Sequence, residues 1–310
     1  MNLNQRQLRM FTVLVMEGHF SRASEQLHIS QPALSRAIQE LEAQLGVVLF
    51  NRTTRQLALT QEGQLFLPMA QRLLRDMAQI TDELRGQAMG VSGTVTLAVG
   101  TAFGSVLLPP MLLQFRQAFP QVQVRLLDDN SAGITGRVLR AEADLGIGSP
   151  LGDTAALDCE RLVRAPLGLL WMPSQNAKPS ARSKPPEDLP VLREPEDSSI
   201  MNILRMRGSP LVARMQQGME VSSLALQLAL ARSGVGVAVV SALGASHPMA
   251  QGMRFEPLQP ALDREIFLMT QRTRILSASA KALLTAIREA LAPERAPAGL
   301  HARVQMERLT

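Results

Sequence analysis

The chain has 310 residues, of which 46% are hydrophobic and 19% are charged, a composition typical of a soluble protein with one or two globular domains. No uninterrupted apolar run reaches the length of a membrane span, and residues 1–4 do not begin a secretory signal peptide. The single cysteine, Cys159, excludes an internal disulfide and fits a reducing cytoplasm, where we expect the protein to reside.

The net charge of +5 is mildly basic and comes almost entirely from arginine: of the 32 basic residues, only Lys178, Lys184 and Lys281 are lysines. Arginine binds phosphate with a planar fork, so this bias suits nucleic-acid contact, but genome composition explains it more simply. Positive charge is also not concentrated near the N-terminus. Charge alone therefore does not predict DNA binding, and the prediction rests on the pattern of side chains.

The first 46 residues contain three short helical patterns separated by tight turns. A first helix over 3–17 is predicted from apolar residues at helical spacing: Leu8, Phe11, Leu14 and Val15. Ser21 is expected to cap a short second helix over 21–28. The third helix is expected to follow Ser30, with Pro32 in its first turn, where the missing N–H costs nothing. Its buried stripe is predicted to be Leu34, Ile38, Leu41 and Leu45. This arrangement, polar at the start of the third helix, predicts a helix-turn-helix.

A hairpin and a long helix are expected next. Residues 47–60 alternate like a small hairpin, which adds a wing with Arg52 and Arg55 at its tip. Between 60 and 90, apolar side chains recur every three or four positions: Phe66, Met69, Leu73, Met77, Ile80 and Leu84. This narrow stripe predicts one helix, kinked or locally opened at Pro68, that pairs with a second copy of itself. Packing against its own domain is the alternative, and residues 86–93 are predicted to be a linker.

After the linker the periodicity changes to alternating strands and helices, which predicts doubly wound parallel sheets. The predicted strands of the first unit are 94–100, 122–128 and 144–148. A second unit begins near 167 and contains a proline-rich surface loop, an apolar helix and a strand, at 174–190, 222–234 and 235–241. A late strand over 265–271 and a helix over 277–291 follow.

The first 63 residues resemble the LysR-type transcriptional regulators of bacteria. The resemblance is carried by Phe11, Gly18, Phe20, Ala23, Leu27, the run from Ser30 to Ser35, Ile38, Leu41-Glu42, Leu45-Gly46, Leu49-Phe50, Arg52, Arg55, Leu59-Thr60 and Gly63. His19 and Ser24 are small departures from the family pattern. The rest of the chain matches more loosely, through "ADLGIG" and "LARSGVGVAVVS".

The resemblance implies an α/β protein: an N-terminal winged helix-turn-helix and a long linker helix, then two Rossmann-like lobes resembling periplasmic binding proteins. The implied parts are a DNA-binding domain, a dimerisation helix with a hinge, an effector-binding domain and a mobile tail, at 1–59, 60–90, 91–292 and 293–310. Within the effector domain, lobe I comprises 91–163 and 265–292, and lobe II comprises 164–264. The implied partners are double-stranded DNA, a small-molecule effector, further copies of the chain in a dimer and then a homotetramer, and RNA polymerase, with no membrane and no cofactor.

In such regulators the third helix enters the major groove with its N-terminal part against the base edges. The expected DNA-contacting residues are Ser21, Ser30, Gln31, Pro32, Ala33, Ser35, Arg36, Gln39, Arg52 and Arg55. Arginine forks to guanine and glutamine to adenine, whereas serines at helix starts are better placed for phosphates. The wing arginines are expected at a neighbouring minor groove or at phosphates. For Gln39, a solvated surface position is an equal alternative.

Ligands of open α/β sheets collect at the carboxyl ends of strands, beside helix N-termini. The expected effector-contacting residues are Thr101, Ala102, Phe103, Asn130, Ser131, Ser199, Ser222 and Ser223, with Phe103 as an apolar wall. Each serine alone could simply cap a helix, and their convergence on one cleft is implied by the resemblance. A carboxylate is the favoured ligand, but a neutral one remains open because the sequence fixes no basic residue there.

An enzyme or a plain solute-binding protein built on the α/β lobes is the alternative function. Cys159 has no histidine near it in sequence, and His247 and His301 lack metal-ligand spacing. The sequence also lacks a phosphate-binding loop and a nucleophile elbow. A solute-binding protein needs export and has no use for residues 1–63. We therefore expect no catalytic activity and no metal site.

Overall fold

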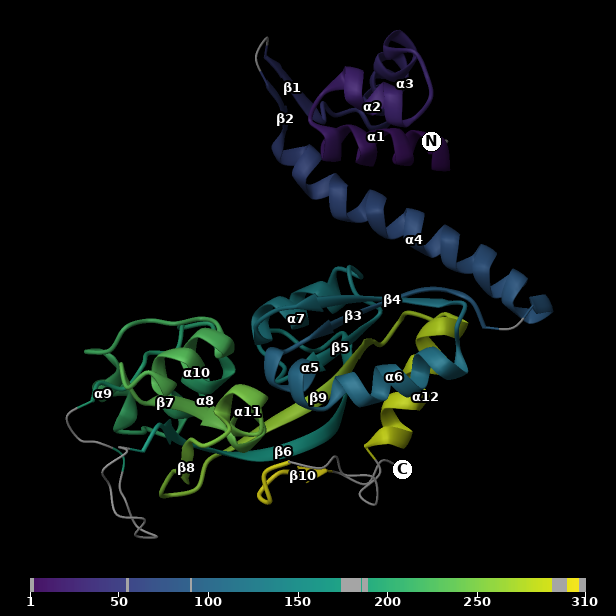
Figure 1. Cartoon of the computed structure of the whole chain (residues 1–310). Coiled ribbons are helices and arrows are strands. Elements are labelled where there is room, and N and C mark those ends of the chain that lie inside the picture. The colour runs from purple at the N-terminus through teal and green to yellow at the C-terminus, as the bar shows by residue number, and fades with distance from the viewer. Residues whose placement is uncertain are drawn as a thin grey trace. The chain divides into compact units, whose positions relative to one another are not determined.

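The computed structural model describes residues 3–53, 56–89, 91–173, 185, 189–291 and 300–306. The chain divides into two compact units, residues 1–88 and 89–310 (Figure 1). Each unit has its own buried core.

The N-terminal unit begins with the predicted helix-turn-helix, which is confirmed. Its helices are α1 (Gln5–Glu17), α2 (Phe20–Gln26) and α3 (Gln31–Leu45). A capping box between Asn4 and Gln7 starts α1. Ser30 caps α3 by accepting the backbone N–H of Ala33 at 3.4 Å. Leucine, isoleucine and phenylalanine side chains from all three helices fill the core, among them Phe11, Leu34, Ile38 and Leu41.

The predicted capping role of Ser21 is wrong. The second helix begins at Phe20, and His19 occupies the cap position without a side-chain hydrogen bond. Ser21 therefore lies inside α2, where its carbonyl accepts the hydroxyl of Ser24 at 2.8 Å. The turn at Gly18, with φ of 67°, is tight enough for the chain to re-enter a helix two residues later.

The wing and the long helix follow as predicted. Strands β1 (Phe50–Thr53) and β2 (Gln56–Leu59) form an antiparallel hairpin, in which Arg52 is the register partner of Leu57. Helix α4 (Gln61–Met89) starts where Thr60 Oγ1 accepts the N–H of Gly63 at 3.0 Å, and it continues through Pro68. Because α4 extends to Met89, the linker predicted over 86–93 is wrong over its first half, which is helical.

Helix α4 has two apolar faces, and the predicted stripe mixes them. One face packs on the unit's own core and includes Phe66, Leu67, Ala70 and Leu74; the ring centre of Phe66 lies 5.1 Å from that of Phe11. The other face is exposed and includes Leu65, Met69, Leu73, Met77 and Ile80. The predicted place of Phe66 in the pairing stripe is therefore wrong, because Phe66 lies on the inner face. The side chain of Leu84 lies outside the described residues.

Lobe I of the C-terminal unit is built on a mixed sheet with the strand order β10-β6-β9-β5-β3-β4. Its parallel part consists of β3 (Gly93–Val99), β4 (Val122–Asp128) and β5 (Leu145–Gly148). Strands β6 (Leu157–Trp171) and β9 (Asp263–Gln271) run antiparallel to each other, and β9 also runs antiparallel to β5. The prediction of a purely parallel sheet is therefore wrong, because β9 returns to the first lobe and inserts between β5 and β6.

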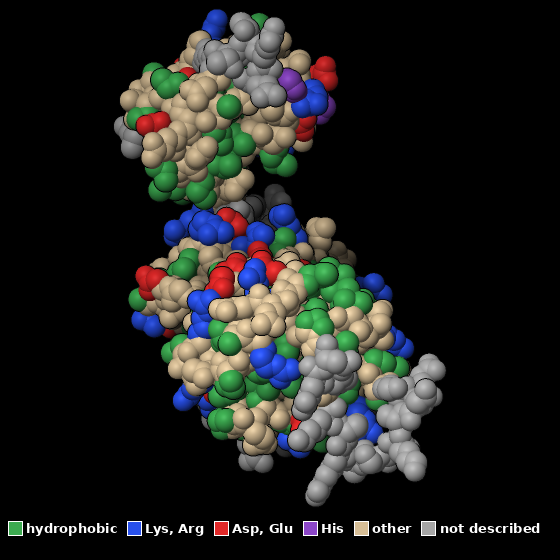
Figure 2. All heavy atoms as spheres, turned by 90° about the vertical axis from the view of Figure 1, so that its left-hand side faces the viewer, with side chains coloured by type: hydrophobic (Ala, Val, Ile, Leu, Met, Phe, Trp, Pro, Cys, Tyr) green, Lys and Arg blue, Asp and Glu red, His purple; other side chains and the backbone are tan. Residues whose placement is uncertain are grey.

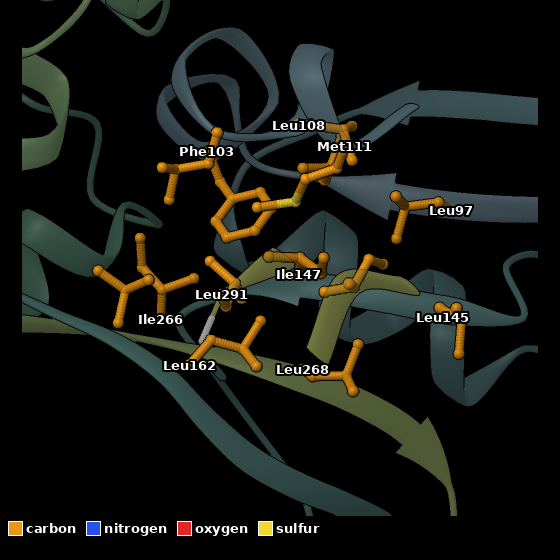
Figure 3. Close-up of a cluster of buried hydrophobic side chains, with 14 of the residues drawn as sticks. Leu97, Phe103, Leu108, Met111, Leu145, Ile147, Leu162, Ile266, Leu268 and Leu291 are labelled. Carbon is orange, nitrogen blue, oxygen red and sulfur yellow. The ribbon is translucent and has the colours of Figure 1, made fainter. Parts of the chain in front are cut away.

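Helices cover this sheet and complete its core. They are α5 (Thr101–Val106), α6 (Leu108–Ala118), α7 (Ser131–Leu139) and α12 (Ala278–Ala290). Figure 3 shows how Phe103 of α5, Met111 of α6 and Ile147 of β5 meet above Leu162 and Leu268, which belong to β6 and β9. Burial of these side chains is the main stabilising contribution to lobe I.

Lobe II surrounds the far half of β6. Strands β7 (Ala238–Ser241) and β8 (Arg254–Pro257) pair antiparallel with β6 between Leu167 and Trp171. The surrounding helices are α8 (Ser199–Met206), α9 (Leu211–Met215), α10 (Leu224–Arg232), α11 (Ala242–Ala245) and the short 3-10 turn η1 (Pro248–Ala250). Strands β6 and β9 thus pass between the lobes (Figure 1).

The segment predicted as a mobile tail, 293–310, contains a strand. Gln305–Met306 forms β10, which pairs antiparallel with Arg164 and Val163 of β6. The ring centre of His301 lies 4.9 Å from that of Phe255, and the His301 N–H donates to Ser246 Oγ at 2.9 Å. The prediction is wrong for residues 300–306, because pairing with a sheet edge needs no apolar periodicity; the rest of that segment lies outside the described residues.

Candidate DNA-binding surface and interlobe cavity

The first two turns of α3 present polar side chains to solvent. Ser30, Gln31, Pro32, Ala33, Arg36 and Gln39 are exposed and Ser35 is half-buried, while Leu34, Ile38 and Leu41 on the opposite face are completely buried. Within the described part of the chain, Arg36 and Gln39 form no side-chain hydrogen bond or ion pair. Their donors are therefore not occupied by the protein itself, as recognition of base edges requires.

The other predicted DNA contacts lie on α2 and on the wing. Ser21 is exposed, but it lies within α2 instead of at its start. The backbone of Arg52 belongs to β1, whereas its side chain and the whole of Arg55 lie outside the described residues. On the face shown in Figure 2, the coloured basic and acidic side chains are interspersed. The pattern of α3 is thus a more specific indicator than bulk charge.

A cavity of about 90 Å³ lies between the two lobes of the C-terminal unit. Lobe I contributes the start of α5 and the start of α7. Lobe II contributes the segment before α8, the first turns of α8 and α10, and the turn into α11. The lining residues are Gly100, Thr101, Ala102, Asp129, Asn130, Ser131, Glu194, Ser198, Ser199, Ile200, Ser222, Leu224, Gln227, Ser241, Gly244 and Arg264.

Most of the predicted effector residues meet in this cavity: Thr101, Ala102, Asn130, Ser131, Ser199 and Ser222. Two do not. Phe103 is 1% exposed and belongs to the core of lobe I (Figure 3), because its position on α5 turns the ring toward the sheet. Ser223 occupies the cap position of α10 without a side-chain cap and is exposed away from the cavity lining.

Side chains of lobe I and lobe II touch at the cavity rim. Asn130 accepts the N–H of Gly133 at 2.8 Å and thereby caps α7, while its amide nitrogen donates to Asp197 Oδ2 across the lobes at 2.8 Å. Thr101 Oγ1 donates to Asp128 Oδ1 at 3.0 Å. The predicted polar residues therefore serve partly as caps and partly as a direct link between lobes.

The cavity also contains an arginine that sequence reasoning missed. Arg264, at the start of β9, donates from Nε to Ser149 Oγ at 3.2 Å, and that hydroxyl donates to the carbonyl of Glu265 at 2.6 Å. No other hydrogen bond or ion pair is formed by the Arg264 side chain within the described residues. Burial lowers the pKa of this guanidinium and Glu194 opposes the shift, but an arginine remains charged at neutral pH.

A buried glutamate was also missed. Glu194 is 7% exposed, and its Oε1 accepts the side-chain N–H of Gln227 at 2.6 Å. Burial raises the pKa of this carboxyl, while hydrogen bonds from Gln227 and Ser198 and the charge of Arg264 oppose the rise. Glu194 follows an irregular segment and Arg264 starts a strand, so neither position carries a local sequence signal for a ligand site.

Ser199 is the clearest unoccupied group in the cavity wall. The residue is 5% exposed, and its Oγ has no hydrogen-bond partner among the described residues. An unpaired buried hydroxyl costs roughly 1–3 kcal/mol. Its neighbour Ser198 carries out the capping instead, because Ser198 Oγ accepts the N–H of Met201 at 3.0 Å. Ser199 is therefore free to bind a ligand.

The described residues offer little support for an enzyme, which would need a group such as a reactive thiol or a bound metal. Burial raises the pKa of the Cys159 thiol, and Asp158 raises it further against the opposing effect of Arg272, which disfavours a reactive thiolate. No cluster of three metal-ligating side chains occurs in the described ranges. Among those same residues, no helix combines the length and apolar character needed to cross a bilayer.

Two family models match the chain and together cover most of it. The model described as a bacterial regulatory helix-turn-helix protein of the lysR family matches residues 5–64. The model described as the LysR substrate binding domain matches residues 88–292. The boundary between the two matches lies within α4.

Several proteins are similar over nearly their whole length. The uncharacterized HTH-type transcriptional regulator YfeR of Shigella flexneri is 25% identical, over 93% of this chain and 94% of its own. The HTH-type transcriptional regulator CrgA of Neisseria meningitidis serogroup C is 29% identical, over 81% of this chain and 84% of its own.

Solved structures share the fold. Full-length CbnR in complex with its target DNA superposes with a TM-score of 0.66 at 21% identity, covering 93% of this chain and 100% of CbnR. A full-length OxyR variant from Pseudomonas aeruginosa gives a TM-score of 0.65 at 23% identity, covering 93% of this chain and 95% of OxyR.

Proposed function

Because the chain belongs to the LysR family of DNA-binding transcriptional regulators, we propose that a small carboxylate held between its lobes controls how it acts on DNA. Family membership makes the protein a regulator and sets aside an enzyme or an exported solute-binding protein. The effector, its contacts and the assembly are the parts that we propose.

The observation that supports a carboxylate as the effector is the presence of Arg264 in the cavity wall. Ser149 fixes Arg264 through Nε, which leaves both terminal amino groups of the guanidinium for a ligand. A carboxylate matches that fork with two parallel hydrogen bonds, and such charge-assisted pairs are about twice as strong as neutral ones. The unpaired hydroxyl of Ser199 adds a third donor from lobe II.

A ligand in this position favours the closed arrangement of the lobes. Arg264 belongs to β9, which pairs with β5 in the sheet of lobe I, whereas Ser199 belongs to α8 of lobe II. A ligand that contacts both residues therefore binds the closed state better and shifts the balance toward it. The hydrogen bond between Asn130 and Asp197 also links the two sides. We infer that the effector adds to this link and that the shift toward closed lobes alters how the DNA-binding unit acts.

For DNA recognition we propose that Arg36, Gln31 and Gln39 read base edges and that Ser30 approaches a phosphate. Their exposure and the free donors of Arg36 and Gln39 support this division. The exposed face of α4 is proposed to pair with a second copy, as a two-fold symmetric DNA site requires. Assembly to a tetramer, action through RNA polymerase and a cytoplasmic location are inferred from the family.

Calorimetric titration of the full-length protein with acetate, propionate and other short carboxylates tests the effector site. We expect the variant Arg264→Gln to bind them about tenfold more weakly or worse, because the charge-assisted pair is lost. The matched control is Arg125→Gln, which removes an exposed arginine of β4, in the same lobe as Arg264, that does not line the cavity. Equal affinity for wild type and Arg264→Gln would place the ligand elsewhere.

A further inference from the structure

The cavity wall contains an acidic group as well as a basic one. The Glu194 carboxylate is held in place by Gln227, whose side-chain nitrogen donates both to Glu194 Oε1 at 2.6 Å and to the carbonyl of Val221 at 2.9 Å. Because Gln227 is 3% exposed and both its amide hydrogens are used, its orientation is fixed. A carboxylate has about four lone-pair sites, so Glu194 keeps acceptor capacity for a ligand.

The two charges of the cavity do not neutralise each other by contact. Glu194 and Arg264 feel each other's charge, yet no ion pair within 4.0 Å joins them in the described structure. A buried charge is costly unless a partner and hydrogen bonds compensate it. A ligand with opposite charges at its two ends compensates both groups, whereas a simple carboxylate compensates Arg264 alone and is repelled by Glu194.

We propose that the cavity selects a small zwitterion, an α-amino acid or a close amino carboxylate, whose carboxylate binds Arg264 and whose ammonium group binds Glu194. The inference rests on the proposed effector site and deepens it by naming the ligand class. Ser199 Oγ, buried without a partner, accepts a hydrogen bond from the ammonium or donates one to the carboxylate. A cavity of about 90 Å³ restricts the ligand to a few heavy atoms.

Matched pairs of ligands that differ only in the amino group test this inference on the full-length protein. The pairs are glycine with acetate, alanine with propionate, and serine with 3-hydroxypropionate, each titrated by calorimetry near neutral pH. We expect at least one amino acid to bind about tenfold or more tightly than its deaminated partner, since a hydrogen bond to a charged group has that value. This comparison uses wild-type protein and does not depend on the folding of a variant.

Variants then test whether Glu194 causes the preference for the amino acid over its deaminated partner. In Glu194→Gln, which preserves the size and the hydrogen bond to Gln227, the preference for the amino acid should fall by about tenfold while the deaminated partner binds equally or better. The matched control, Glu196→Gln, changes an exposed glutamate on the same segment, paired with Arg205 outside the cavity, and should preserve the preference.

The outcomes separate this inference from the proposed function. If acetate, propionate or 3-hydroxypropionate binds wild type as tightly as its amino partner and Arg264→Gln abolishes that binding, the effector site stands and the zwitterion is wrong. If the preference exists but survives in Glu194→Gln, Glu194 is not its cause and the inference is overturned. If no member of any pair binds, both the effector site and the zwitterion are rejected.

Discussion

Arg36 is a residue of α3 for which we propose base recognition, and its surroundings support that role. It is exposed on the second turn of α3, opposite the buried Leu34 and Ile38, and it is not tied to any described part of the protein. A guanidinium that contacted its own fold would first have to break that contact before it could read a base. The spacing of polar and apolar residues along α3 was sufficient to predict this exposure.

We expect Arg36→Ala to weaken binding to the operator by roughly 1–3 kcal/mol and to leave nonspecific binding nearly unchanged. Gel-shift titrations with operator DNA and with a scrambled duplex at one salt concentration measure the ratio. The control Arg9→Ala removes another exposed arginine, on α1, and should keep the ratio. Equal weakening on both duplexes would make Arg36 a phosphate contact.

Glu194 makes the stability of the ligand-free protein depend on pH. Because burial raises its pKa in the folded state, folding favours the protonated form. The protonated Glu194 carboxyl therefore stabilises the folded protein fully below the ordinary glutamate pKa of about 4.3. This stabilisation is lost as the pH rises through the raised pKa of the folded state. Above that range the folded protein bears the cost of a buried charge.

Glu194→Gln removes this dependence while keeping the size of the side chain. Thermal unfolding of wild type and variant without ligand, from about pH 4 to about pH 8, should show similar stability at the acidic end. Toward neutral pH the variant should become the more stable of the two. A difference that stays constant with pH, or grows in the opposite direction, would contradict the assigned shift.

At the scale of the element, α4 shows what periodicity predicts and what it does not. The repeat of apolar residues every three or four positions correctly predicted one helix through Pro68. It did not separate the two apolar faces, because a residue one position away from a stripe still lies close to it. The packing of Phe66 against Phe11 and the complete burial of Ala70 identify the inner face.

The exposed face of α4 gives a prediction about assembly. Leu73 lies in the middle of this face and is 44% exposed, so Leu73→Asp should leave the unit folded. A carboxylate in an apolar helix pair cannot be buried without a partner, so association through α4 should be lost and the mass of the assembly should halve in sedimentation. Gln64→Asp, at an exposed polar position of α4, is the control; an unchanged assembly in Leu73→Asp would refute this interface.

At the scale of the whole molecule, the sequence predicted the helix-turn-helix, the wing and the succession of strands and helices, since each depends on a local pattern. The cavity was predicted only in part. Ser199 and Asn130 lie at helix starts, which sequence signals mark. Arg264 and Glu194 lie far apart in the sequence. Both line one cavity only because β9 returns to lobe I between β5 and β6.

The paired passage of β6 and β9 makes lobe II an insertion into lobe I. The chain leaves lobe I near Pro166 and comes back at Asp263, which is its register partner on the neighbouring strand. The N–H of Leu167 donates to the carbonyl of Leu262 at 2.7 Å, so exit and re-entry are adjacent. An insertion with adjacent ends can be exchanged as a cassette without rethreading its host. Replacing it would change Glu194, to which we attribute ligand selection, and would leave α3 untouched.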